Sequence, residues 1–206
     1  LSEIISFQGS KVFPSHGLLS FFYDLDELRW GGDPTDLSGF NVFYFPNSDI
    51  LQEKENPNIE FQIKETPLKF FSMKTIPCYG SRAGDKLEEK FREEKKWDEY
   101  LDFSYEYPAS FCPVETPYFH QLLGHSANVQ GDMQEEAQLI TNGFDVTEYN
   151  SPKTEHLKDG IEDWLLLLQL DMSDFFGFGC SIYYWIRKQD LAAQNFDKVW
   201  MTPQCD

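Results

Sequence analysis

Short apolar runs bounded by glycine, proline and acidic residues form the strongest pattern in the chain. Leu18–Tyr23 and residues 41–45 are runs of this kind near the start, and Trp164–Asp171 and residues 181–186 lie near the end. Runs of four to eight residues rich in aromatic and branched side chains, with turn residues on both sides, are typical of buried β-strands. We therefore predict strands over these four ranges.

Weaker signals extend the predicted sheets. Alternating apolar and polar residues at 60–64 and 68–73 favour two more strands, and residues 199–201 favour a last one. The polar stretches 51–58 and 144–160 are typical of loops.

Residues 85–101 carry the clearest helical pattern. Asp85 can cap the first turn, and Glu88 and Arg92 stand four residues apart, a spacing that stabilises a helix locally. The apolar stripe is narrow and the rest is charged. This pattern predicts a helix that buries one face and leaves the other in water.

A second helix is predicted to begin after Asp132 and to end at Asn142-Gly143, although residues 133–141 also fit the period of a strand. A third, short helix is predicted over residues 188–195. Together these elements predict an α+β fold, with mostly antiparallel, twisted β-sheets and two or three helices.

The chain also shows a pattern of internal duplication. A strand that ends in acids, a glycine loop and an aromatic strand occur once in residues 1–80 and again in residues 120–206. Two related β-rich halves would explain the recurrence. Chance similarity between hydrophobic strands explains it equally well.

The charge balance narrows the classes of partner. The chain has 35 acidic and 17 basic residues and a net charge of −18. This surface repels phosphate backbones, so we expect no nucleic acid partner. No apolar run reaches the roughly 20 residues of a membrane span, so we expect no membrane association and a cytoplasmic location. The charge either steers a basic protein partner to the surface or serves solubility alone.

The common signatures of metal and catalytic sites are missing from the sequence. The four cysteines, at 78, 112, 180 and 205, form no C-x-x-C pair, and there is no H-E-x-x-H, G-x-S-x-G or phosphate-binding loop. We therefore expect buried, reduced cysteines, no metal site and no cofactor.

Four blocks together resemble one family. They are residues 13–24, residues 30–36 with 42–44, residues 122–125 with 129–133, and residues 164–206. In order and content they are similar to the bacterial YwqG-like family, a domain of unknown function, and the resemblance covers nearly the whole chain. It implies a single α+β domain over residues 1–206, with one further β-rich segment before Leu1.

One departure from the family pattern concerns residues 178–180. In family members, the three residues before the aromatic strand usually resemble tryptophan–glycine–aspartate. This chain has Phe178, Gly179 and Cys180 there. If the acid serves a site in relatives, that site is altered here. The resemblance implies no catalytic residue.

Two loops and one strand end carry the candidate ligand-binding residues. His125, Gln130 and Asp132 place an imidazole, an amide and a carboxylate within eight residues, although Asp132 is equally suited to cap the helix that follows.

The other candidates are acids beside an aromatic residue or a buried strand. Trp30 precedes Asp33 and Asp36, which can bind a cation or a sugar, or merely tie a turn by bonds to the backbone. Asp171 and Asp174 end the strand at Trp164–Asp171 and can perform acid–base chemistry.

Two functions remain open on the sequence. The first is a non-enzymatic binding or regulatory module, such as an immunity-type protein, that captures a basic protein partner. The second is a hydrolase that uses His125 with the carboxylates at Asp33 and Asp36 or at Asp171 and Asp174. Convergence of these groups in one cleft would favour the hydrolase, and separate turns would favour the module. The sequence does not indicate an oligomeric state.

Overall fold

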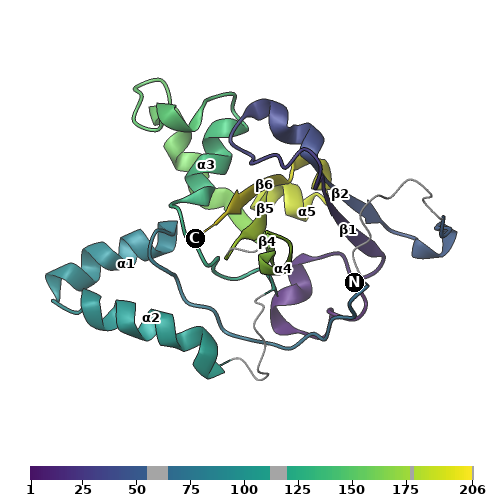
Figure 1. Ribbon diagram of the computed structural model, residues 1–206, viewed down its shortest axis with the longest axis horizontal. Coiled ribbons are helices and arrows are strands. Elements are labelled where there is room, and N and C mark those ends of the chain that lie inside the picture. The colour runs from purple at the N-terminus through teal and green to yellow at the C-terminus, as the bar shows by residue number, and fades with distance from the viewer. Residues whose placement is uncertain (55–64, 112–119, 177–178, 206) are drawn as a thin grey trace.

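The structure is a computed structural model, which describes residues 1–54, 65–111, 120–176 and 179–205. Its described strands form two antiparallel sheets, and helices surround them (Figure 1). The α+β fold class predicted from the sequence is confirmed. No helix of the described residues is long and apolar enough to cross a membrane.

The larger sheet has four strands in the order β3 (Gln121–Leu122), β4 (Trp164–Asp171), β5 (Ser181–Arg187) and β6 (Trp200–Gln204). The smaller sheet pairs β1 (Leu18–Tyr23) with β2 (Phe40–Phe45). The apolar runs of the sequence account for β1, β2, β4 and β5. Each predicted half therefore contains an antiparallel strand pair, and the internal duplication stays a prediction.

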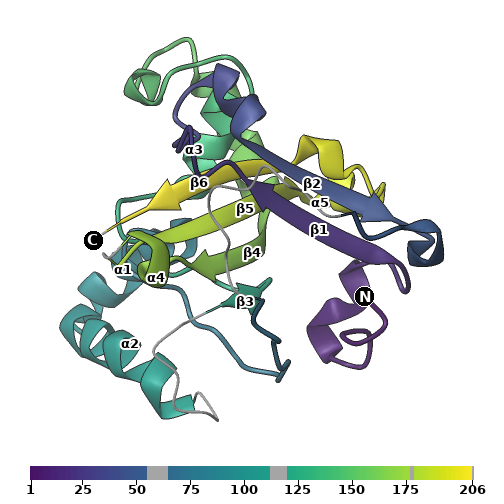
Figure 2. The same ribbon diagram turned by 45° about the vertical axis from the view of Figure 1, so that its right-hand side comes forward.

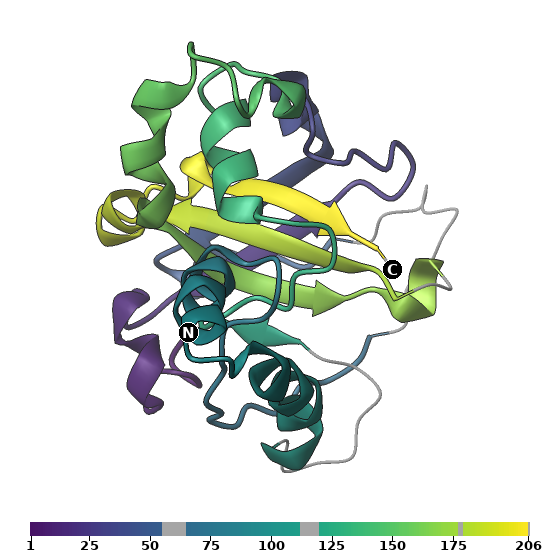
Figure 3. The same cartoon turned by 90° about the vertical axis from the view of Figure 1, so that its left-hand side faces the viewer.

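Strand β5 is covered on both faces, which explains its run of aromatic residues. Neighbouring residues of a strand point to opposite faces. The Tyr184 hydroxyl donates to the carbonyl of Phe22 in β1, whereas the Tyr183 hydroxyl donates to the carbonyl of Ala127 in a loop before α3. The two views in Figure 2 and Figure 3 show β1 and β2 on one side of the larger sheet and α3 on the other.

The core follows the predicted apolar positions of β4 and β5. Trp164, Leu166, Tyr183 and Trp185 are all buried, and Leu170 is partly buried against the same cluster. The pairing of β4 with β5 shifts register between Leu166 and Leu168. An extra residue in one strand breaks the in–out alternation, which explains why three successive leucines are buried.

The helical part departs from the prediction at several points. The helix predicted over residues 85–101 is two helices, α1 (Arg82–Glu93) and α2 (Trp97–Phe111), because Lys95 between them has a positive φ of 57°. Ser81, and not Asp85, caps α1, since its hydroxyl accepts from the Gly84 amide at 3.1 Å. The helix begins at Arg82, so the polar side chain directly before it, that of Ser81, occupies the capping position.

The remaining helices include the two that were predicted. They are α3 (Met133–Ile140), α4 (Ser173–Phe176) and α5 (Lys188–Ala192), with 3₁₀ turns η1 (Gln8–Val12), η2 (Pro34–Gly39), η3 (Ser48–Ile50), η4 (Val146–Glu148), η5 (Glu155–Asp163) and η6 (Phe196–Lys198). The predicted loop 144–160 therefore contains η4 and most of η5.

The prediction of a strand at residues 68–73 is wrong, since these residues pair with none of the described strands and most of them are exposed. Alternation alone does not fix a strand without a partner. The strand predicted at 60–64 lies outside the described residues.

The expectation of reduced cysteines is wrong for one pair. Cys180 and Cys205 form a disulfide. They flank the last rung of the β5–β6 pair, where Ser181 lies opposite Gln204, so the register brings them together. Cys180 occupies the position at which the family pattern described above has an aspartate. Cys78 is a free thiol, and Cys112 lies outside the described residues.

We predict that Trp164→Ala or Trp185→Ala lowers the free energy of unfolding by about 3–5 kcal/mol, because each indole is buried. The phenylalanine variants separate packing from hydrogen bonding. The Trp164 indole donates to Gln138 Oε1 at 2.9 Å, whereas the Trp185 nitrogen has no hydrogen-bond partner within the described chain.

In urea unfolding, Trp164→Phe should therefore cost about 1 kcal/mol more than Trp185→Phe. Alanine variants that melt like the parent would contradict the predicted core.

Candidate functional site

A cleft of about 420 Å³ lies between the Trp30 loop, the start of α3 and the end of β6. Its walls come from four segments of the chain. They are lined by Trp30, Gly32, Gln130, Gly131, Asp132, Glu136, Val146, Tyr149, Pro203 and Gln204. Three of the residues predicted from the sequence, Trp30, Gln130 and Asp132, therefore come together in one place.

Four predicted site residues, Asp33, Asp36, His125 and Asp171, do not line this cleft. Asp33 caps η2, where it accepts from the amide and the hydroxyl of Thr35 at 2.7 and 2.6 Å. Asp36 completes this capping box and lies 3.5 Å from Arg29. The structure thus bears out the turn role that the sequence left open for these two acids.

Asp171 caps a local turn, whereas His125 is bound through its backbone. The Asp171 carboxylate accepts from the amide and the hydroxyl of Ser173, at 2.9 and 2.6 Å, at the start of α4. The His125 backbone amide donates to the Thr75 hydroxyl at 2.8 Å, and its carbonyl accepts from the Gln121 amide group at 2.7 Å. The groups that the hydrolase hypothesis requires are therefore distributed over separate turns.

The Trp30 wall is fixed by a close contact with β6. Gly31 has a positive φ of 66°, and a Cβ there would collide with the Met201 carbonyl oxygen. The buried Trp200 indole donates to the Gly31 carbonyl at 3.1 Å. These contacts hold the loop in place while 56 % of Trp30 stays exposed, so the indole is available to a ligand.

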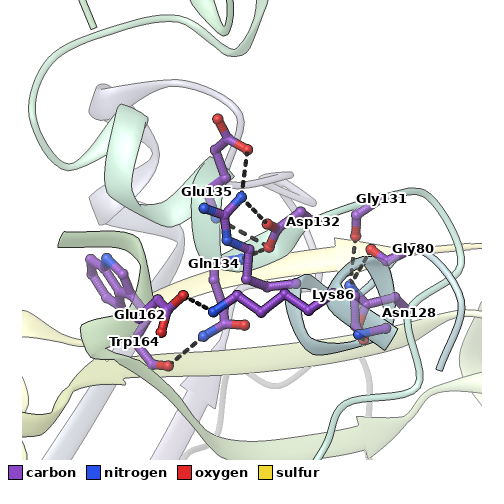
Figure 4. Close-up of polar contacts among 12 residues, drawn as sticks. Gly80, Lys86, Asn128, Gly131, Asp132, Gln134, Glu135, Glu162 and Trp164 are labelled. Carbon is purple, nitrogen blue, oxygen red and sulfur yellow. Dashed lines mark hydrogen bonds and ion pairs between the residues drawn. The ribbon is translucent and has the colours of Figure 1, made fainter. Parts of the chain in front are cut away.

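The opposite wall is a loop, residues 125–131, whose backbone is bound by the side-chain amides of the buried Gln204 and the half-buried Asn128. Gln204 Oε1 accepts from the amides of Val129 and Gln130 at 2.7 and 3.0 Å. The Asn128 side chain donates to the carbonyls of Gly80 and Gly131 at 3.1 and 2.6 Å (Figure 4). Buried polar groups persist when they are paired in this way.

The side-chain amide of Gln169 binds the same loop further from the cleft. Gln169, in the middle of β4, accepts from the Ala127 amide at 3.0 Å and is 2 % exposed. Sequence reasoning missed Gln169 and Gln204. Each is a lone glutamine within or beside an apolar strand, and this pattern could have identified them. A buried side-chain amide there needs a hydrogen-bond partner.

Asp132 is both a helix cap and an incompletely satisfied acid. Its Oδ1 accepts from the Gln134 and Glu135 amides at 3.0 and 3.3 Å, so the predicted cap of α3 is confirmed. Its Oδ2 is buried without a hydrogen-bond donor among the described residues, and it forms an ion pair of 3.9 Å with Arg82. Figure 4 shows Asp132 with its neighbour Glu135 at the helix start. Burial raises the pKa of Asp132 to about 6.

Glu136 lies one turn further along α3 and was not predicted as a site residue. Burial, with the nearby Asp132, raises the pKa of Glu136 to about 7. No ion pair joins Glu136 to a cation within the described chain. Burial also raises the pKa of the Tyr149 hydroxyl, and Glu135 and Asp132 raise it further.

The arrangement is an acidic cleft whose nearest described cation, Arg82, lies outside the lining and forms ion pairs of 3.9 Å with Asp132 and Glu135. Two carboxylates are held in a poorly solvated wall, an indole stands at the mouth, and Val146 and Pro203 add apolar surface. A carboxylate in such surroundings either keeps a proton or binds a cation. The described residues include no cluster of three or more histidine, cysteine or acidic side chains able to hold a metal ion.

Comparison with known families places the whole cleft inside one domain. The family model for a domain of unknown function, DUF1963, matches residues 1–205. The chain belongs to the DUF1963 family. No curated protein matches it. The match includes every residue that lines the cleft in this DUF1963 chain, so cleft and fold belong to the same domain.

For the DUF1963 chain we predict that Gly31→Ala destabilises the fold by about 2 kcal/mol or more, because the new Cβ is strained at positive φ and collides with β6. Gly32→Ala is the matched control, since a Cβ there meets no atom within 4 Å. Urea unfolding should separate the two variants. Equal stability would show that β6 does not fix the Trp30 loop.

The raised pKa of Glu136 predicts a stability that falls as pH rises. Between its ordinary pKa of 4.5 and its folded value of about 7, the native state holds more protons than the unfolded state. The free energy of unfolding therefore decreases with pH across this window.

At pH 8, Glu136→Gln should stabilise the protein by on the order of 1–2 kcal/mol and flatten this slope. Glu93→Gln, an exposed acid on α1, removes the same charge and should leave the slope intact. Denaturation between pH 5 and 8.5 tests this, and parallel slopes for the two variants would contradict it.

Proposed function

We propose that this chain is a non-enzymatic binding module that captures a basic protein partner, and that the cleft takes a cationic side chain of that partner. The observation that carries the proposal is the Asp132 carboxylate. Its side chain is only 7 % exposed, it lines the cleft, and among the described residues Oδ2 has no hydrogen-bond donor and only an ion pair of 3.9 Å with Arg82. A buried acceptor without a donor is costly, and an incoming N–H group would satisfy it.

The rest of the cleft suits a lysine or arginine side chain. Glu136 offers a second carboxylate one helical turn away, and Trp30 presents an exposed indole at the mouth. A cation over an indole face gains about 0.5–2 kcal/mol. Val146 and Pro203 can contact the methylene stem, which favours a long side chain over a bare metal ion.

The net charge supports the same class of partner. A charge of −18 attracts a basic protein over distances longer than any single contact. An immunity-type role, a YwqG-like identity, a bacterial origin and a cytoplasmic location belong to this proposal. The sequence resemblance and the acidic composition support them.

The hydrolase alternative has less geometric support. Asp33, Asp36 and Asp171 each bind their own turn, the His125 backbone is bound by Thr75 and Gln121, and none of the four residues lines the cleft. The pair of Asp132 and Glu136 has raised pKa values suited to acid–base chemistry, but no histidine joins them at the cleft. Substrate turnover that stops in Glu136→Gln would revive this alternative.

The site is tested with a lysine-rich peptide and its fully acetylated counterpart at pH 8 and low salt. We expect the lysine peptide alone to bind, and Asp132→Asn to weaken it about tenfold, about 1.4 kcal/mol. Asparagine keeps the cap of α3, so the fold should survive this change.

Glu93→Gln is again the charge-matched control, and this single change outside the cleft should weaken binding by less than about twofold. Equal binding by Asp132→Asn, Glu136→Gln and Glu93→Gln would show that the cleft does not hold the cation.

Long-range steering makes a separate kinetic prediction. Glu89 and Glu93 are exposed on α1 and form no ion pair within the described chain, whereas Glu94 pairs with Lys96 at 3.2 Å. Replacing Glu89, Glu93 and Glu94 together by glutamine should slow association with the lysine peptide more than it speeds dissociation, at a stability change below about 0.5 kcal/mol.

The association rate of the parent should fall steeply with salt. A salt-independent rate, or duplex DNA bound below micromolar concentration, would contradict the electrostatic account.

A further inference from the structure

The Cys180–Cys205 disulfide lies next to the residue that holds the cleft wall. It joins the residue before β5 to the residue after β6 and spans 25 residues of sequence. The last rung of this strand pair, Ser181 opposite Gln204, lies directly inside the cross-link. The cross-link therefore prevents the end of β6 from separating from β5.

Gln204 connects this strand end to the cleft. Its side chain is buried, its Oε1 accepts from the amides of Val129 and Gln130, and its Nε2 donates to the Gly131 carbonyl at 3.4 Å. Two successive loop amides thus depend on one side chain at the last rung of β6, which shares the Gly131 carbonyl with Asn128. Gln130, Gly131 and Gln204 themselves line the cleft.

We propose that Cys180–Cys205 is a thiol–disulfide exchange site at which a dithiol reductant loosens the cleft wall. The two sulfurs differ in access, since Cys180 is 4 % exposed and Cys205 is partly exposed. Attack therefore falls on Cys205, and the more accessible sulfur forms the mixed disulfide.

The exchange balances in two steps. A thiolate of the dithiol attacks Cys205 Sγ, the sulfur–sulfur bond breaks, and Cys180 leaves as a thiolate that takes up a proton. The second thiol of the reductant then attacks the mixed disulfide as its thiolate and releases Cys205. The reductant ends as a disulfide, and the protein has gained two electrons and two protons.

Reduction should act on one part of the loop and not on all of it. Without the cross-link, the last rung of β6 opens more often, and the amides of Val129 and Gln130 lose their acceptor. Ala127 is held by Gln169 in the middle of β4, two strands away from the end of β6. Its amide is therefore an internal reference.

Hydrogen exchange of the three amides, followed by NMR in oxidised and dithiothreitol-reduced protein, tests this inference. We expect Val129 and Gln130 to exchange at least about tenfold faster after reduction, while Ala127 changes less than about twofold. Cys180→Ser/Cys205→Ser should reproduce the reduced pattern in either condition, which excludes an effect of the other thiols. Equal acceleration at all three amides, or none at any, would overturn the proposal.

The consequence for binding rests on the proposed function and is measured separately. The lysine-rich peptide should bind the oxidised protein at least about threefold more tightly than the reduced protein, because the wall around Asp132 is then better ordered. A changed exchange pattern with no peptide binding in either state would remove the proposed function and leave the exchange site standing. Equal peptide affinity in both states would remove the link between the two.

Discussion

The cleft depends on one buried interaction, the side-chain amide of Gln204 bound to the backbone of residues 129–131. A loop carries backbone donors and acceptors that burial leaves unsatisfied unless a side chain replaces water. Gln204 and Gln169 do this from two strands of the same sheet. The rigid sheet thus fixes the loop, the loop fixes the start of α3, and α3 presents Asp132 and Glu136.

The same construction leaves the cleft electrostatically unfavourable when it is empty. Two half-buried acids lie close together, and the pKa of each is raised mainly by desolvation. A protein retains such groups at the expense of stability when they have a use, because folding alone favours a neutral residue there. A cationic side chain would relieve both the desolvation and the mutual repulsion.

Local patterns in the sequence were enough to predict four of the strands and the cap of α3. The apolar runs predicted β1, β2, β4 and β5, and Asp132 before an amphipathic stretch predicted the helix start. Contacts between distant segments were not accessible in this way. The break at Lys95 depends on a positive φ, and the Cys180–Cys205 pair depends on strand register.

The candidate site was predicted in part for the same reason. Trp30, Gln130 and Asp132 were found because each stands in a distinctive loop. Nothing local distinguished them from His125, which does not line the cleft, or from Asp33, Asp36 and Asp171, which cap their own turns. Glu136 was missed although it shares the buried face of α3 with Met133 and Ala137. An acid on the apolar face of a helix was the signal for it.

The central claim is that Asp132 and Glu136 are desolvated acids that bind a cationic side chain of a partner. Carboxyl NMR titration of these two residues tests it most directly. In the free protein we expect apparent pKa values of about 6 and about 7. With saturating lysine-rich peptide, both pKa values should fall, since a bound ammonium stabilises the charged form. Ordinary values in the free protein, or raised values that the peptide leaves unchanged, would contradict the account.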